Sequence, residues 1–118
     1  MRGTAATFAR FSAFAGSNLR RLPAPLQRAA AFLRGHYDMR QHTMTTAAHA
    51  RALEDDFIDW FGIAGTPELA VTRLRALAQL GLDFVHVVPA SGGVPREVVL
   101  KSMQLLGTEV LPALRQTT

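Results

Sequence analysis

Four histidines and one run of acidic residues are the side chains of this sequence that could do chemistry. His42 and His49 are seven residues apart, which on a helix is an axial separation of roughly 10 Å. That is too far for two ligands of one zinc ion, whose bonds are about 2 Å long. His86 lies inside an apolar run, where a structural role is the usual one. The spacing therefore predicts no metal site.

The acidic run comprises Glu54, Asp55, Asp56 and Asp59. Paired carboxylates can perform acid–base catalysis, but only in a pocket that raises the pKa of one of them. Adjacent acids that lead toward an apolar segment are more often a solvated surface. The sequence has no Cys, no Ser-His-Asp arrangement with a nucleophile turn, no dinucleotide-binding glycine motif and no P-loop. These enzyme classes are therefore excluded, and no catalytic residue is predicted.

Charge is divided unevenly along the 118 residues. Residues 1–53 contain eight Arg and one acid, a net charge of +7, whereas residues 54–118 have a net charge of −3. The basic half is compatible with a small helix-rich interaction module that binds nucleic acid or an acidic partner. The first 34 residues contain no acid, as in a mitochondrial import sequence, but Pro23 and Pro25 would break its helix. The basic half has neither a Lys-rich stripe nor a regular Arg spacing, so nucleic-acid binding is not the favoured interpretation. We expect its arginines to form a solvated or partner-facing helix surface.

The apolar spacing predicts the elements that position these residues. A short helix is expected in the segment 4–22, where Phe8, Phe11 and Phe14 recur every third residue, and it ends at residues 16–18; a second is expected over residues 25–34, ending at Gly35. From residue 61 onward the expected order is strand 61–64, helix from Pro67 to Gly81, strand 84–88 and helix from Pro95 to Pro112. The chain is accordingly divided into a mostly helical region, residues 1–55, and a strand–helix–strand–helix region, residues 56–118.

Two strands joined by a helix must be parallel, and such a pair leaves hydrogen-bonding edges without partners. The second region therefore looks like a piece of a larger sheet or barrel. The uncharged runs are shorter than the roughly 18 apolar residues that a membrane span requires. With no Cys, a reducing, cytoplasmic location is expected.

Several segments of the second half follow one another in a characteristic order: residues 61–68, 73–77, 80–83 and 109–112. Together with residues 6–11 and 37–42, this series resembles the luciferase-like flavin-dependent oxidoreductases, in the branch described as methylenetetrahydromethanopterin-reductase-like. The resemblance implies an α/β fold: this chain would be the C-terminal fragment of a (β/α)₈ TIM barrel, its last two βα units preceded by a helical insertion.

The resemblance also implies the function. Members of the luciferase-like family either transfer hydride to a small organic substrate or, as monooxygenases, insert oxygen into one. Their coenzyme is FMN or a deazaflavin. A complementary N-terminal barrel chain is a possible partner, and this chain alone is expected to be inactive.

Phosphate binding at the loops after strands seven and eight is frequent in such barrels. Gly65 and Thr66 would occupy the first loop, and Ser91 and Gly92 the second, so these four are the candidate cofactor-binding residues. Alternatively, Gly65 and Thr66 only form a tight turn and a helix cap. Tyr37 and His42 lie in a segment that matches the family and are the candidate substrate-binding residues.

Overall fold

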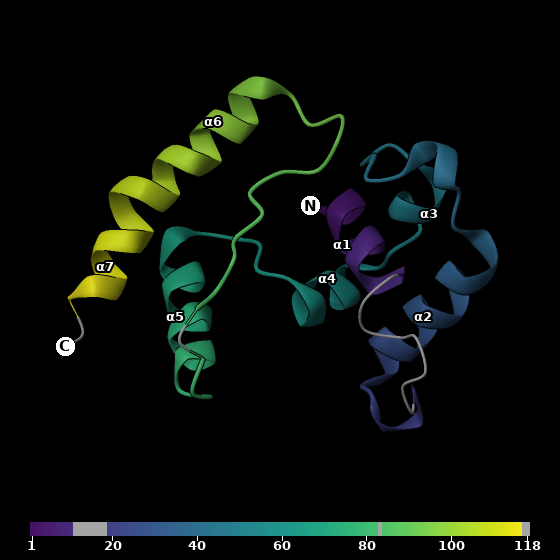
Figure 1. The fold of residues 1–118 in the computed structure, drawn as a ribbon, viewed down its shortest axis with the longest axis horizontal. Helices are drawn as coiled ribbons and strands as arrows, with labels where there is room; N and C mark the ends of the chain where they lie inside the picture. Colours follow the sequence, from purple (N-terminus) through teal and green to yellow (C-terminus); the bar gives the residue numbers. More distant parts are fainter. Residues whose placement is uncertain (11–18, 83, 117–118) are drawn as a thin grey trace. The chain divides into compact units, whose positions relative to one another are not determined.

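The computed structural model describes residues 1–10, 19–82 and 84–116 (Figure 1). The chain divides into two compact units, which are described separately: unit 1, Met1–Gly62 with Ala90–Val94, and unit 2, Ile63–Pro89 with Pro95–Thr118. Unit 1 contains α1 (Arg2–Phe8), η2 (Leu19–Arg21), α2 (Ala24–His36), η3 (Met39–Gln41), α3 (Ala48–Arg51) and α4 (Asp55–Phe61). Unit 2 contains α5 (Pro67–Ala78), α6 (Arg96–Leu105), η4 (Leu106–Val110) and α7 (Leu111–Arg115). Among the described residues, no helix combines the length and the apolar character needed to cross a bilayer.

The predicted α/β barrel fragment is wrong, because the described residues contain no β-strand. Their only isolated bridge is a parallel one between Met44 and Gly92. The expected strand 61–64 begins with Phe61, which is the last residue of α4, and the expected strand 84–88 is irregular. The physical reason is that a strand needs a neighbour to bond its main-chain groups. Neither segment finds one here.

Small side chains build the core of unit 1. Ala6, Ala9, Ala30, Ala47 and Ala50 are at most 1% exposed and lie among larger residues such as Phe57 and Leu33. Because alanine has only a methyl group, helices that meet through it can approach closely. Gly3 of α1 extends this contact: a Cβ built on it would overlap the carbonyl oxygen of Thr43 and lie 2.8 Å from the backbone of Met44 and Thr45. The first helix therefore lies directly against the loop at residues 43–45.

The helix expected over residues 25–34 is confirmed as α2, but Gly35 does not end it. The helix continues to His36, and the chain leaves it at Tyr37, which is extended. The short helix expected in the segment 4–22 is present as α1 at its start, and Phe11, Phe14 and the expected end at residues 16–18 lie outside the described residues.

Unit 2 is held together by few buried side chains. Of its described hydrophobic residues, only Val71 and Val110 are buried. The predicted start of α5 is confirmed, with Pro67 in the first turn and the Thr66 hydroxyl accepting a hydrogen bond from the N–H of Leu69 at 3.4 Å. Gly81 has the left-handed conformation expected of it, with φ of +80°.

The last helix does not end at Pro112, contrary to prediction. A π-helical turn, η4, precedes α7, and the helical path continues to Arg115. Proline lacks the N–H that an α-helix would use and its ring crowds the preceding turn, so a locally wider turn accommodates it. The Arg75 guanidinium donates to the carbonyl oxygen of Ala113 at 3.0 Å and so joins α5 to α7.

Candidate functional site

Tyr37 and His42, the two predicted substrate-binding residues, are brought together by the turn that follows α2. The hydroxyl of Tyr37 lies 2.8 Å from Nδ1 of His42 and 3.0 Å from the hydroxyl of Thr7 in α1. The short helix η3 makes this possible because it reverses the chain between the two residues. Asp38 fixes the turn, since its carboxylate accepts a hydrogen bond from the N–H of Arg40 at 2.8 Å.

His49, which was not a predicted site residue, completes the site. It is 1% exposed, and its ring lies 4.2 Å from the ring of Tyr37, measured between centroids. Its Nδ1 accepts a hydrogen bond from the N–H of Asp38 at 3.2 Å, so the proton of the neutral ring resides on Nε2. Nε2 is buried and has no hydrogen-bond partner among the described residues. We call Thr7, Tyr37, His42 and His49 the Tyr37 cluster.

Burial disfavours the charged form of His49. Desolvation lowers the pKa of His49 below its ordinary value of 6.5; the nearby charge of Asp38 opposes this effect and that of His42 adds to it. The cluster thus presents a phenol, two imidazoles and an aliphatic hydroxyl, which can donate to and accept from a polar ligand. Among the described residues, no group of three His, Cys, Asp or Glu side chains could hold a metal ion.

The spacing argument missed His49 because it assumed that His42 and His49 share one helix. His42 in fact follows η3 and His49 belongs to α3, with a turn between them that contains Thr43 in a left-handed conformation, φ 65°. The signal available in the sequence was a histidine flanked by alanines, at positions 47, 48 and 50, which is a buried environment.

Ser91 and Gly92, two candidate cofactor-binding residues, fasten residues 90–94 to the rest of unit 1. The Ser91 hydroxyl accepts a hydrogen bond from the N–H of Thr4 at 2.9 Å, and the Thr4 hydroxyl donates to the carbonyl of Ala90. The N–H of Gly92 donates to Thr43, and its carbonyl accepts from Thr45 at 2.9 Å. The polar groups expected to face a phosphate are therefore already bonded within the unit.

Gly65 and Thr66, the other two candidates, form the turn and cap that begin α5 in unit 2. Gly65 has φ of +144°, and a Cβ on it would lie 2.6 Å from Cδ2 of Leu69. A hydrogen bond from Thr66 is the main cause that lowers the pKa of Glu68 in the first turn. The geometry thus has the turn-and-cap form considered above, and the two candidate pairs belong to different units.

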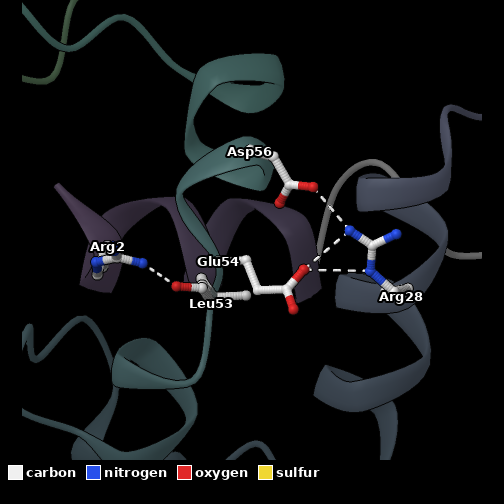
Figure 2. A network of polar contacts seen from close by, with 5 residues as sticks. All are labelled: Arg2, Arg28, Leu53, Glu54 and Asp56. Carbon is white, nitrogen blue, oxygen red and sulfur yellow. Dashed lines mark hydrogen bonds and ion pairs between the residues drawn. The ribbon is translucent and has the colours of Figure 1, made fainter.

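The acidic run forms ion pairs with arginines of the basic half (Figure 2). Arg28 of α2 contacts Glu54 at 2.9 Å and Asp56 at 2.7 Å. Arg2 of α1 hydrogen-bonds the carbonyl of Leu53 and pairs with Asp55. The side chains of Arg28, Glu54, Asp55 and Asp56 stay about half or more exposed, so these three acids form a solvated, arginine-paired surface at the start of α4. The same contacts neutralise two of the eight arginines of residues 1–53.

Comparison with known proteins gives one partial match. Over 66 residues, 56% of this chain, the sequence is 36% identical to a 5,10-methylenetetrahydromethanopterin reductase from Archaeoglobus fulgidus. That enzyme is a member of the luciferase-like family. The match covers 19% of the reductase, so the chain spans about a fifth of the length of the curated relative it matches. No family model matches the chain, and no solved structure does.

Proposed function

We propose that this chain acts as part of a luciferase-like oxidoreductase and contributes the Tyr37 cluster to substrate binding. The observation that carries the proposal is the 36% identity to the Archaeoglobus fulgidus reductase. The structure adds that Tyr37 and His42, which lie in a segment resembling the family, share a hydrogen bond of 2.8 Å. Polar side chains that meet in this way can orient a polar ring.

The name of the relative indicates the substrate class. That enzyme reduces a tetrahydropterin that carries a one-carbon unit, and we extend the class, a partly reduced pterin ring with N–H and carbonyl groups, to this chain. The Tyr37 hydroxyl and Nδ1 of His42 bond each other, and the hydroxyl also contacts Thr7, so a pterin ring would exchange one of these contacts for its own N–H or carbonyl group. The Nε2–H of His49 is a further donor in the cluster, available once the substrate or a water molecule reaches it.

The candidate coenzyme residues do not fit a coenzyme phosphate as they stand. The hydroxyls of Thr66 and Ser91 and the N–H of Gly92 are all engaged in hydrogen bonds within their own units. A flavin or deazaflavin coenzyme therefore belongs to the proposal only at the level of the family. We expect it to be held mainly by a complementary chain, and we expect the isolated chain to be inactive.

Equilibrium dialysis with a tetrahydropterin tests the substrate proposal. We expect weak, saturable binding that Tyr37→Phe weakens by about two- to tenfold, the effect of losing one hydrogen bond. The matched control is His36→Gln, because His36 is the exposed neighbour of Tyr37 and stacks on Phe32 instead. Circular dichroism verifies that both variants keep their helices. Equal affinity of Tyr37→Phe and wild type would remove Tyr37 from the site.

The coenzyme part of the proposal has its own test. FMN and a deazaflavin are titrated with the chain alone, and quenching of their fluorescence is followed. We expect no saturable binding with a dissociation constant in the micromolar range. Micromolar binding by the isolated chain would show that it holds the coenzyme without a complementary chain.

A further inference from the structure

Residues 90–94 bond the face of α1 that carries Thr7. The Ser91 hydroxyl accepts a hydrogen bond from the N–H of Thr4 at 2.9 Å and lies 2.9 Å from the Thr4 hydroxyl. Thr4 and Thr7 are three residues apart in α1, so they share one face of the helix. The Thr7 hydroxyl lies 3.0 Å from the hydroxyl of Tyr37. Ser91 therefore fixes the part of α1 that contacts Tyr37.

The same five residues also bond the turn that follows His42. The N–H of Gly92 donates to the carbonyl oxygen of Thr43 at 3.0 Å, and the carbonyl of Gly92 accepts from the N–H of Thr45 at 2.9 Å. Thr43 has a left-handed backbone, φ 65°, which is strained in threonine and persists where surrounding contacts hold it. His42, the residue before it, lies with Nδ1 2.8 Å from the Tyr37 hydroxyl.

Residues 90–94 are packed against this turn as well as bonded to it. Ser91 is buried, at 7% exposure. A Cβ on Gly92 would lie 3.1 Å from Sδ of Met44 and from Oγ1 of Thr43, and 3.3 Å from the carbonyl oxygen of Thr43. A larger residue at position 92 would therefore press on the turn next to His42.

We propose that Ser91 and Gly92 are positioning residues of the Tyr37 cluster. They hold Thr7 and His42 at the distances from which both bond the Tyr37 hydroxyl. Neither touches the substrate: Ser91 acts through α1, and Gly92 acts through the turn at residues 43–45. The role differs from the coenzyme binding expected of these residues from the sequence, and it rests on the proposed function for what the cluster binds.

An NMR signal of Tyr37 tests the positioning directly. Tyr37 is the only tyrosine of the chain, so tyrosine labelled with carbon-13 at Cζ gives a single resonance, which responds to the hydrogen bonds of its oxygen. We expect Ser91→Ala and Gly92→Ala each to shift this resonance. The matched controls in unit 2 are Ser102→Ala and Gly107→Ala, and a Cβ on Gly107 has nothing within 4 Å. The controls should leave the resonance where it is in the wild type.

Binding of a tetrahydropterin, measured by equilibrium dialysis, separates positioning from a general structural role. We expect Ser91→Ala to weaken binding about two- to fivefold, because it disturbs hydrogen bonds of the cluster. In a Tyr37→Phe background the same substitution should weaken binding no further, because the hydroxyl that Ser91 helps to place is gone.

Two results would overturn the proposal, once circular dichroism shows that the variants keep their helices. The Tyr37 resonance could stay unshifted in both Ser91→Ala and Gly92→Ala, or Ser91→Ala could weaken binding equally with and without the Tyr37 hydroxyl. A wild type that binds no tetrahydropterin would contradict the proposed function instead. The Tyr37 resonance alone would then decide whether Ser91 and Gly92 position the cluster.

Discussion

Tyr37 and His49 show how single side chains define the candidate site. Tyr37 leaves the end of α2 and hydrogen-bonds both Thr7 and His42, while its ring covers the ring of His49. His49 in turn accepts a hydrogen bond from the backbone of Asp38. Since the ring is buried and its Nδ1 is an acceptor, adding a proton to His49 would both charge a buried group and remove this hydrogen bond.

Stability should therefore fall in mild acid because of His49. Its pKa is lowered in the folded chain, so below the ordinary value of 6.5 the unfolded chain binds a proton that the folded chain does not. The contribution is fully present above about pH 6.5 and is lost as pH falls toward the lowered pKa. Thermal unfolding between pH 8 and pH 5 measures it. His49→Asn, which keeps an acceptor but cannot titrate, should flatten the profile, and exposed His86→Gln should not. A profile that His49→Asn leaves unchanged would assign the acid sensitivity to other groups.

Gly3 tests the close approach of α1 to residues 43–45. In Gly3→Ala the new methyl group would overlap backbone atoms of Thr43, Met44 and Thr45, which cannot rotate away. We expect a loss of about 1–3 kcal/mol in the free energy of unfolding, measured with urea.

Gly35→Ala is the control for this change. Gly35 lies within α2, and a Cβ there has nothing within 4 Å. That variant should gain about 0.4–1 kcal/mol in stability. The close approach would be disproved if the two glycine variants had the same stability.

Among the elements, α1 depends on a residue that is distant in sequence. Met1, the residue that precedes α1, makes no side-chain hydrogen bond that caps the helix. Instead, the N–H of Thr4 in the first turn donates a hydrogen bond to the hydroxyl of Ser91. Ser91→Ala should therefore destabilise the chain by about 0.5–2 kcal/mol, the usual cost of losing a cap. Urea unfolding measures this, with Ser102→Ala in α6 as the control. If the Ser91 and Ser102 variants are equally stable, Ser91 does not cap α1.

Proline, a capping residue and the apolar repeat were enough to predict the helices whose start is marked in the local sequence. Pro25 and the apolar repeat at Leu26, Ala29 and Leu33 predicted α2, and Thr66 with Pro67 predicted the start of α5. Ser91 could not be predicted as a cap, because no sequence pattern connects it with Thr4 across 87 positions. The same holds for His49, which reaches Tyr37 only through the turn at residues 43–47.

The prediction of two strands was wrong because strand formation depends on the whole molecule. Strand propensity at 84–88 describes a fit to a sheet, and a sheet needs partners that this chain does not provide among its described residues. Phe61 instead packs on Phe57 within α4, with ring centroids 5.1 Å apart. The strands were predicted from their apolar runs, and the resemblance that assigned them to a barrel is to a family whose matched member this chain spans over about a fifth of its length.

The alternative function, a helix-rich module that binds nucleic acid or an acidic partner, depends on the charge that the whole molecule presents. Arg20, Arg21, Arg40 and Arg51 are exposed, whereas Arg2 and Arg28 are paired with acids of the chain. Local pairing of arginine reduces the charge available to a phosphate backbone. Retention on a DNA column that falls steeply with salt would favour this alternative over the oxidoreductase proposal.

On the proposal made here, this chain binds its substrate at the Tyr37 cluster. The most direct measurement is a titration of the isotopically labelled chain with a tetrahydropterin, in which nitrogen–proton NMR spectra report every backbone amide. We expect saturable shifts at Thr7, at residues 37–42 and at His49, with the amides of α5 unchanged. Shifts confined to α5 and its preceding turn, or none at millimolar ligand, would contradict it.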